Sequence, residues 1–208
     1  MVTVEADVDQ VESRLAAGEL SCPLCGGVLA GWGRARVRQL RGRHGPLELR
    51  PRRSRCTGCG VTHVLLPVSA LLRRADTAAV IVSALAAKAT SRAGFRRIAA
   101  DVARPAETVR GWLRRFGERA EAVRSVFTVW LRAVAADPVM PDAVGGMFAD
   151  AVVAIVALAG AITRRFLLPE VSVAETAVAV SGGRLLAPGW PGEPLQHEST
   201  LPPTSMRP

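Results

Sequence analysis

The spacing of apolar residues changes near Pro67 and divides the chain into two parts. Before Pro67, apolar and polar residues alternate at a period of two, as in Arg34-Ala35-Arg36-Val37-Arg38, which is typical of a β-strand. After it, apolar residues recur every three or four positions, as they do on one face of a helix. The pattern therefore predicts an α+β chain, with small β-strands first and a mainly α part after them.

Two short helices are expected on either side of Arg104-Pro105. The first covers Phe95 to Val102, and the second begins at Pro105 or Ala106, because proline is tolerated in the first turn of a helix. Their apolar, inward-facing residues are Ile98, Ala99, Val109, Leu113 and Phe116. Two helices joined in this way form a helix-turn-helix. The alternative is a helical hairpin with no role in nucleic-acid binding.

Further helices are expected at Val8–Leu20 and from a cap at Asp76 or Thr77 to about Thr90. Two longer apolar seams follow, and Asp137-Pro138 and Pro141 mark the turn between them. The seams are Leu113, Phe116, Ala120, Val123, Phe127, Trp130 and Val134, and then Val152, Ile155, Ala159, Ile162 and Phe166. They predict a helical hairpin that closes either within one chain or on a second copy, as a homodimer.

Valines around Ser181-Gly182-Gly183 indicate one or two strands in residues 171–187, and six prolines among residues 188–208 indicate a disordered tail. The run Ala151 to Thr163 has no charge but is shorter than the roughly 18 to 20 residues that span a bilayer, so we expect a buried helix and no membrane contact. The acidic start, Met1 to Gln10, does not have the pattern of a targeting signal. We expect a cytoplasmic protein.

The four cysteines of the chain form two Cys-x-x-Cys pairs, Cys22/Cys25 and Cys56/Cys59, each followed by glycine. A two-residue spacer lets one tight turn present two thiolates to a metal ion, and four thiolates complete the tetrahedral shell of structural zinc. His63 lies four residues after Cys59, but four cysteines already fill the shell. We predict one structural Zn²⁺ in a ribbon whose hairpins fill the long gap between the pairs. A redox dithiol and simple burial are the alternatives.

Positive charge is concentrated in the first two thirds of the chain. Residues 1–136 carry 23 basic and 11 acidic side chains, a net +12, whereas residues 137–208 carry 4 and 7, a net −3. A localised basic region favours a polyanion such as nucleic acid. Arg34, Arg36 and Arg38 would line one face of a strand and follow a phosphate backbone, or simply solvate the ribbon. A codon bias toward arginine would also raise the count.

As an ordered set, the cysteine pairs, the arginine-rich strand and the segment Phe95–Leu113 resemble a family of actinobacterial zinc-ribbon plus helix-turn-helix proteins of unknown function. The set is also similar to the N-terminal DNA-binding half of one group of insertion-sequence transposases. A transposase of that kind needs a large catalytic domain with three carboxylates, which the residues after 120 do not have room for, and no histidine lies in a catalytic pattern. We therefore predict that the protein is not an enzyme.

The predicted organisation is an N-terminal helix (1–20), a four-cysteine zinc ribbon (21–66), a helix-turn-helix (76–120), a helical hairpin that can dimerise (113–168) and a disordered tail (188–208). The predicted function is double-stranded DNA binding, as a regulator or helper associated with a mobile element. With the family resemblance, this implies a bacterial protein associated with the nucleoid. An RNA-binding ribbon and a non-catalytic adaptor that docks a transposase or recombinase are the alternatives. The expected nucleic-acid contacts are Arg34, Arg36, Arg38, Arg52, Arg53, Glu107, Thr108, Arg110, Arg114 and Arg115.

Overall fold

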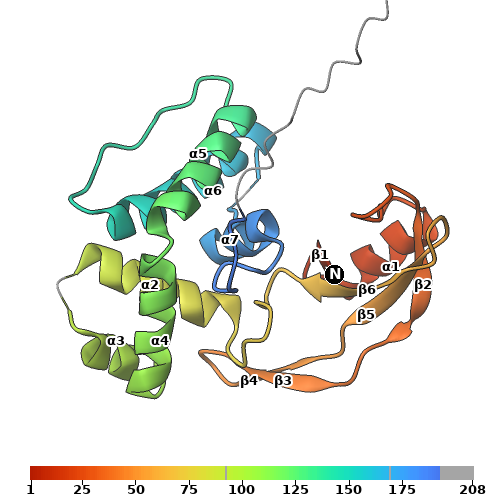
Figure 1. Cartoon of the computed structure of the whole chain (residues 1–208), viewed down its shortest axis with the longest axis horizontal. Helices are drawn as coiled ribbons and strands as arrows, with labels where there is room; N and C mark the ends of the chain where they lie inside the picture. The colour runs from red at the N-terminus through yellow and green to blue at the C-terminus, as the bar shows by residue number, and fades with distance from the viewer. Residues whose placement is uncertain (92, 169, 193–208) are drawn as a thin grey trace, which may run out of the picture.

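The computed structural model describes residues 1–91, 93–168 and 170–192, and it confirms the α+β layout with strands before helices. Figure 1 shows the sheets and the first helix at one end and the other helices at the opposite end. The strands are β1 (Val2–Val4), β2 (Leu29–Arg34), β3 (Arg38–Arg41), β4 (Pro46–Leu49), β5 (Arg52–Cys56) and β6 (Thr62–Pro67). The helices are α1 (Val8–Ala16), α2 (Ala78–Thr90), α3 (Phe95–Asp101), α4 (Ala106–Gly117), α5 (Ala120–Val134), α6 (Met147–Phe166) and α7 (Val173–Ser181).

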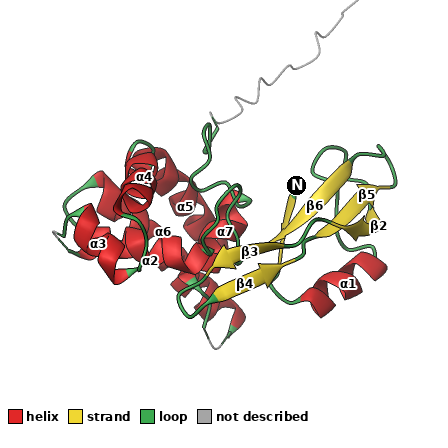
Figure 2. Cartoon of the chain, turned by 90° about the horizontal axis from the view of Figure 1, so that it is seen from below, coloured by secondary structure: helices red, strands yellow, loops and turns green. Residues whose placement is uncertain are grey.

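Four strands form the main sheet in the order β1-β6-β5-β2, and β3 and β4 form a separate hairpin. β1 runs parallel to β6, while the β2–β5 and β5–β6 pairs are antiparallel. α1 packs beside this sheet (Figure 2), where Val11 and Leu15 join Leu29 and Leu65 in a small core. α1 ends four residues before the predicted Leu20, because Gly18 adopts the left-handed region (φ 71°).

The predicted continuous arginine strand is wrong. β2 ends at Arg34 and β3 begins at Arg38, so Arg34, Arg36 and Arg38 do not share one face of one strand. The β2–β5 register shifts between Gly31 and Arg34, and Gly33 has a φ of 95°. A glycine with positive φ at an irregularity of this kind bends a strand out of its ladder. Residues 50 and 51 likewise separate β4 from β5.

The helical part has one large core. α2 contributes Ile81 and Leu85, both fully buried, and α3 and α4 pack against it through Ile98 and Val109. The helices on either side of Arg104-Pro105 are therefore confirmed. Thr77 is the residue before α2, as predicted, but its side chain makes no capping hydrogen bond.

The hairpin of α5 and α6 closes within one chain, which is one of the two predicted alternatives. Val123, Phe127 and Ile155 are buried in the shared core. Two details differ from the prediction. Helix α4 ends at Gly117 before α5 begins, and Trp130 is half exposed while Leu131 takes the buried position.

The predicted strand in residues 171–187 is wrong, because this segment forms helix α7. Its valines and alanines pack on the helical core, with Ala177 and Val178 fully buried. Tertiary packing outweighs the modest strand preference of valine. Gly182, with a φ of 57°, ends the helix instead of turning a hairpin.

The tail begins later than predicted, since Trp190 is buried in the helical core. Arg119 Nη1 donates to the carbonyl oxygens of Trp190 and Pro191 at 3.4 and 3.5 Å. The remainder of the predicted tail, residues 193–208, lies outside the described residues.

Helix α6 is long and apolar enough to cross a bilayer by length and composition, with a mean hydropathy of 1.8. The same test is passed by core helices of globular proteins. In this structure one side of α6 packs against α5, α2 and α7, and Ala151, Ile155, Leu158 and Ala159 are buried there. One side of α6 therefore belongs to the helical core, while Val156 and Phe166 are exposed.

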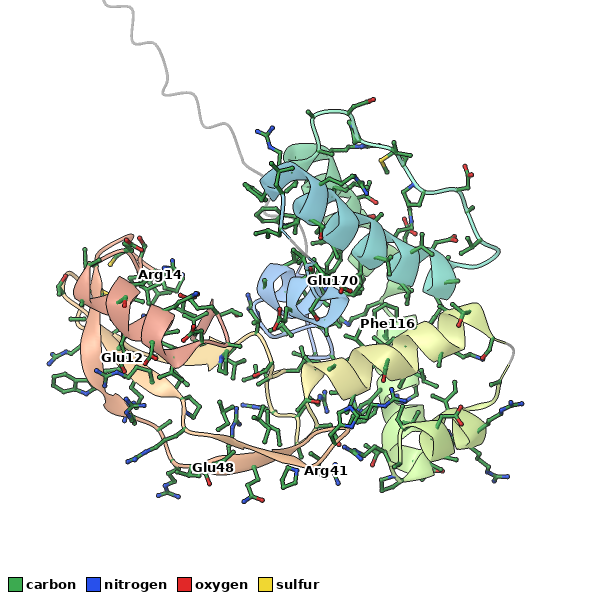
Figure 3. All side chains as sticks on the ribbon, turned by 180° about the vertical axis from the view of Figure 1, so that it is seen from behind. Glu12, Arg14, Arg41, Glu48, Phe116 and Glu170 are labelled. Carbon is green, nitrogen blue, oxygen red and sulfur yellow. The ribbon has the colours of Figure 1, made fainter. Side chains whose placement is uncertain are left out.

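A buried ion-pair network joins the ribbon to the helices. Asp76, whose side chain is 3% exposed, accepts from Arg104 Nε at 2.5 Å and from Arg41 Nη2 at 2.7 Å. Arg104 also donates from Nη2 to the carbonyl oxygens of Arg41 and Gly42, each at 2.8 Å. Figure 3 shows Arg41 at the end of the β3–β4 hairpin nearest the helices. The network holds the turn between α3 and α4 against this hairpin.

Candidate metal centre and nucleic-acid interface

Two turns of the same design bring the cysteine pairs together. In each turn the N–H of the first cysteine donates to the carbonyl five residues on, at 2.7 Å for Cys22 and 2.9 Å for Cys56. A glycine N–H then donates back to the carbonyl of that cysteine, from Gly26 at 2.9 Å and from Gly60 at 3.0 Å. These glycines have φ values of 72° and 73°, which other residues rarely adopt. The glycines after each pair therefore close the turns, as predicted.

The four thiol groups converge on one point. Their Sγ atoms all lie within 4.8 Å of one another, with Cys22 and Cys59 at 3.8 Å and Cys25 and Cys56 at 3.4 Å. Metal–sulfur bonds of about 2.3 Å in a tetrahedron place sulfur atoms about 3.8 Å apart. The cluster therefore has the composition and spacing to hold one metal ion. Convergence of all four thiols favours this interpretation over two separate dithiols.

The backbone of the second turn stabilises the thiolate of Cys56. The N–H groups of Gly58 and Cys59 donate to Cys56 Sγ at 3.3 and 3.4 Å. The Cys59 N–H makes the largest contribution to a lowered pKa of Cys56, about 6, although burial acts in the opposite direction. Donors of this kind orient metal-binding sulfur and neutralise part of its charge.

Gly27 lies so close to the cluster that a side chain would disturb it. A Cβ atom there would stand 3.0 Å from Cys56 Sγ and 3.4 Å from Cys25 Sγ. Gly58 is less crowded, since its Cβ would make ordinary contacts at 3.6 and 3.8 Å. Sequence reasoning gave a role only to the glycine directly after each cysteine pair, and none to Gly27 or Gly58.

His63 lies beside the cluster and is not one of its four converging residues. Its ring is buried, with Nε2 3.4 Å from Cys22 Sγ and Nδ1 3.1 Å from the Met1 amino nitrogen. Burial, and then the positive amino terminus, lower the pKa of His63. A neutral ring can donate its Nε2 proton to a thiolate, so His63 can support Cys22 from outside the shell. The sequence contained no signal for this role beyond the short spacing to Cys59.

Helix α4 presents a polar face to solvent and an apolar face to the core. Val109, Trp112 and Phe116 are buried, and Phe116 meets the ring of Phe148 at 4.9 Å; Phe116 is labelled in Figure 3. Leu113, expected to face inward, is only partly buried, and Trp112 is the deeper anchor.

The predicted contact residues of α4 lie on or beside its polar face. Glu107 and Arg110 pair at 3.5 Å, and Arg114 pairs with Glu118 at 3.0 Å. The side chains of Arg110 and Arg114 are each 62% exposed, so both pairs are weak and can exchange for another partner. The guanidinium of Arg110 also lies 5.6 Å from the ring centre of Phe95 on α3. Thr108 and Arg115 are half-buried on the same helix.

The arginines of the ribbon differ in exposure and in ion pairing, which the sequence did not indicate. Glu12 of α1 pairs with Arg34 at 3.2 Å and with Arg52 at 2.8 Å. Arg53 is half-buried, whereas Arg36 and Arg38 are exposed and have no ion-pair partner among the residues that the structure describes. Arg55, which was not proposed as a contact, lies 4.9 Å over the half-exposed ring of Trp32. The structure therefore separates Arg36 and Arg38 from the arginines already held by α1.

Two arginines important for the arrangement were missed as site residues. Arg104 was noticed only as part of a helix break, yet it anchors that break to the β3–β4 hairpin. Arg74, before α2, shares a cleft with Arg110, Arg114 and Arg115. Neither role has a local sequence signal, because each depends on residues far away in the chain.

No protein-family model, curated protein or solved structure matches the chain.

Proposed function

We propose that this protein binds double-stranded DNA without catalysing a reaction, using α3 and α4 as a helix-turn-helix and a zinc ribbon as its second contact. The observation that supports this most directly is the division of α4 into two faces. Val109, Trp112 and Phe116 fix the helix to the core, while Glu107 and Arg110 project from its first turns. In a helix-turn-helix these first turns reach base edges in the major groove.

The short turn before α4 supports the same proposal. Ala103 adopts the left-handed region (φ 53°), and Arg104 donates to the Val102 and Ala103 carbonyls and to Asp76. The turn is therefore held by fixed contacts on both sides. A rigid turn holds the following helix in one orientation, and recognition of a DNA sequence requires such a fixed orientation.

We propose Zn²⁺ as the metal of the four-cysteine cluster. The donor set is entirely sulfur, and four thiolates in a closed shell are typical of structural zinc. The metal would hold the turn before β2 to the turn between β5 and β6, and so stabilise the ribbon that carries the arginines. Atomic-emission analysis of protein purified without chelator should give one zinc per chain, and less than half would refute the assignment.

The ribbon arginines that we assign to DNA are Arg36 and Arg38, with Arg34, Arg52 and Arg53 as weaker candidates. Phosphate contacts of this kind position a protein on DNA without reading sequence. A role as regulator or helper of a mobile element rests only on the family resemblance described from the sequence.

The deciding experiment is selection of bound fragments from random duplex DNA with the purified full chain. If one sequence is enriched, the affinity of the Arg110→Ala variant is then measured for that site and for random duplex at one salt concentration. A bidentate arginine to guanine discriminates by about 1 to 3 kcal/mol, so specific binding should fall by roughly 5- to 150-fold and nonspecific binding little. Arg132→Ala, an exposed arginine on α5, is the matched control and should leave both unchanged.

The outcomes separate the proposal from its alternatives. Equal losses on both DNAs would make Arg110 a phosphate contact only. No enrichment together with preferential binding of RNA would favour an RNA-binding ribbon. No binding to either nucleic acid would refute the proposal and favour a protein adaptor.

A further inference from the structure

A basic cleft lies between α4 and the loop that precedes α2. The structure brings Arg74 from this loop next to residues of α4 that are more than thirty positions later in the chain. The charged and hydroxyl-bearing residues that line it are Arg74, Glu107, Thr108, Arg110, Arg114 and Arg115. Four of these six are arginines, so the cleft is strongly positive.

The guanidinium of Arg74 has a hydrogen-bond partner for only part of its donors among the described residues. Its Nη2 donates to the Leu186 carbonyl at 2.7 Å, and its Nε is buried with no hydrogen-bond partner among the described residues. Burial first, and then the nearby charge of Arg115, lower the pKa of Arg74. A half-buried guanidinium next to a second one is electrostatically unfavourable unless an anion is present.

Arg115 is also without a carboxylate partner in the part of the chain that the structure describes, and its Nη1 donates to the Gly111 carbonyl at 3.2 Å. The one acid that lines the cleft, Glu107, already pairs with Arg110. Among the described residues, therefore, no carboxylate neutralises Arg74 or Arg115. Thr108 adds a hydroxyl group that can donate to an oxyanion.

We propose that the cleft between Arg74 and Arg115 binds a phosphate group. Two guanidiniums and a hydroxyl match the several acceptor oxygens of phosphate, and guanidinium–phosphate hydrogen bonds are among the strongest in proteins. The phosphodiester of a DNA strand beside α4 is the first source, and this part of the inference rests on the proposed function. Free phosphate is the second source.

Binding of free phosphate is tested first, because this experiment does not depend on DNA binding. The melting temperature of the full chain is measured in increasing inorganic phosphate against chloride of equal ionic strength. Ligands that bind only the folded state raise the melting temperature. The rise should saturate in the natural protein, and it should be lost in Arg74→Gln and Arg115→Gln. Arg73→Gln, which changes the neighbouring exposed arginine, should keep it.

The duplex source is tested by the salt dependence of DNA binding. Loss of one phosphate contact lowers the slope of log affinity against log salt by about 0.9. Arg74→Gln and Arg115→Gln should each show this loss, and Arg73→Gln should not. Arg115→Gln keeps the Arg74–Leu186 hydrogen bond, so it remains informative if Arg74→Gln is unstable.

Each result decides the inference. A phosphate response that depends on Arg74 and Arg115 supports the site even if the protein binds no DNA, in which case only the proposed function fails. A slope change confined to the two variants supports the phosphodiester as the ligand. Two results together would overturn the phosphate site. The first is a melting temperature that phosphate raises equally in the natural protein and all variants, or in none of them. The second is a salt slope that the variants leave unchanged, or no DNA binding at all.

Discussion

The network around Asp76 predicts that one buried carboxylate determines how the ribbon and the helices are held together. Asp76→Ala removes the partner of Arg104, whose side chain is 10% exposed, and of Arg41, whose side chain is 50% exposed. The guanidinium of Arg104 would keep its bonds to backbone carbonyls but lose its counter-charge. Because it cannot reach water freely, its charge would stay buried and uncompensated.

Removal of one partner from a buried ion pair costs about 3 to 5 kcal/mol. The Arg41 contact adds little, since an ion pair with one half-exposed partner is worth about 1 kcal/mol or less. We therefore expect the free energy of unfolding to fall by about 3 to 5 kcal/mol, a large part of the 5 to 15 kcal/mol typical of a natural domain. Urea titration of zinc-loaded protein, followed by far-ultraviolet circular dichroism, measures this change.

Glu12→Ala is the matched control, because Glu12 also pairs with two arginines but is itself 35% exposed. It should cost less than about 1 kcal/mol. The double variant Asp76→Ala with Arg104→Met should recover part of the Asp76→Ala loss by removing the uncompensated charge. If Asp76→Ala costs no more than Glu12→Ala, the buried network does not hold the two parts together and the reasoning is wrong.

Three other predictions concern the turns and the ribbon. Ala103→Gly should raise the free energy of unfolding by up to about 1 kcal/mol, because glycine relieves a left-handed alanine; Ala100→Gly, within α3, should lower it by about 1 kcal/mol in the same titration. Gly27→Ala should weaken zinc binding by at least about tenfold, measured in competition with a chelating dye. Gly58→Ala should bind zinc nearly as tightly as the natural protein. Equal zinc affinities for the two variants would show that a side chain at Gly27 does not crowd the cysteines. Replacing Arg36 and Arg38 together by glutamine should lower the salt slope of duplex binding by about 1.8, and an unchanged slope would show that these arginines only solvate the ribbon.

Local signals in the sequence were sufficient for several parts of the structure. A two-residue spacer and a following glycine define each cysteine turn without help from distant residues. That the two turns converge followed from the four ligands that structural zinc needs, and the pairing of β2 with β5 brings them together. The break at Arg104-Pro105 and the helices beside it were predicted for the same reason, since proline and helical periodicity act within a few residues. The predicted DNA and protein partners remain predictions.

Elsewhere, contacts between distant residues decided the structure. Periodicity alone joined Arg34 to Arg38 in one strand, but the bend at Gly33 and the pairing of β2 with β5 separate them. The valines of residues 171–187 form a helix because the other helices offer them an apolar surface. The same dependence on distant partners explains why Arg74 and Arg104 were missed. Their environments are made by Arg115 and Asp76, and a charge acquires its buried partner only when the tertiary structure brings the two together.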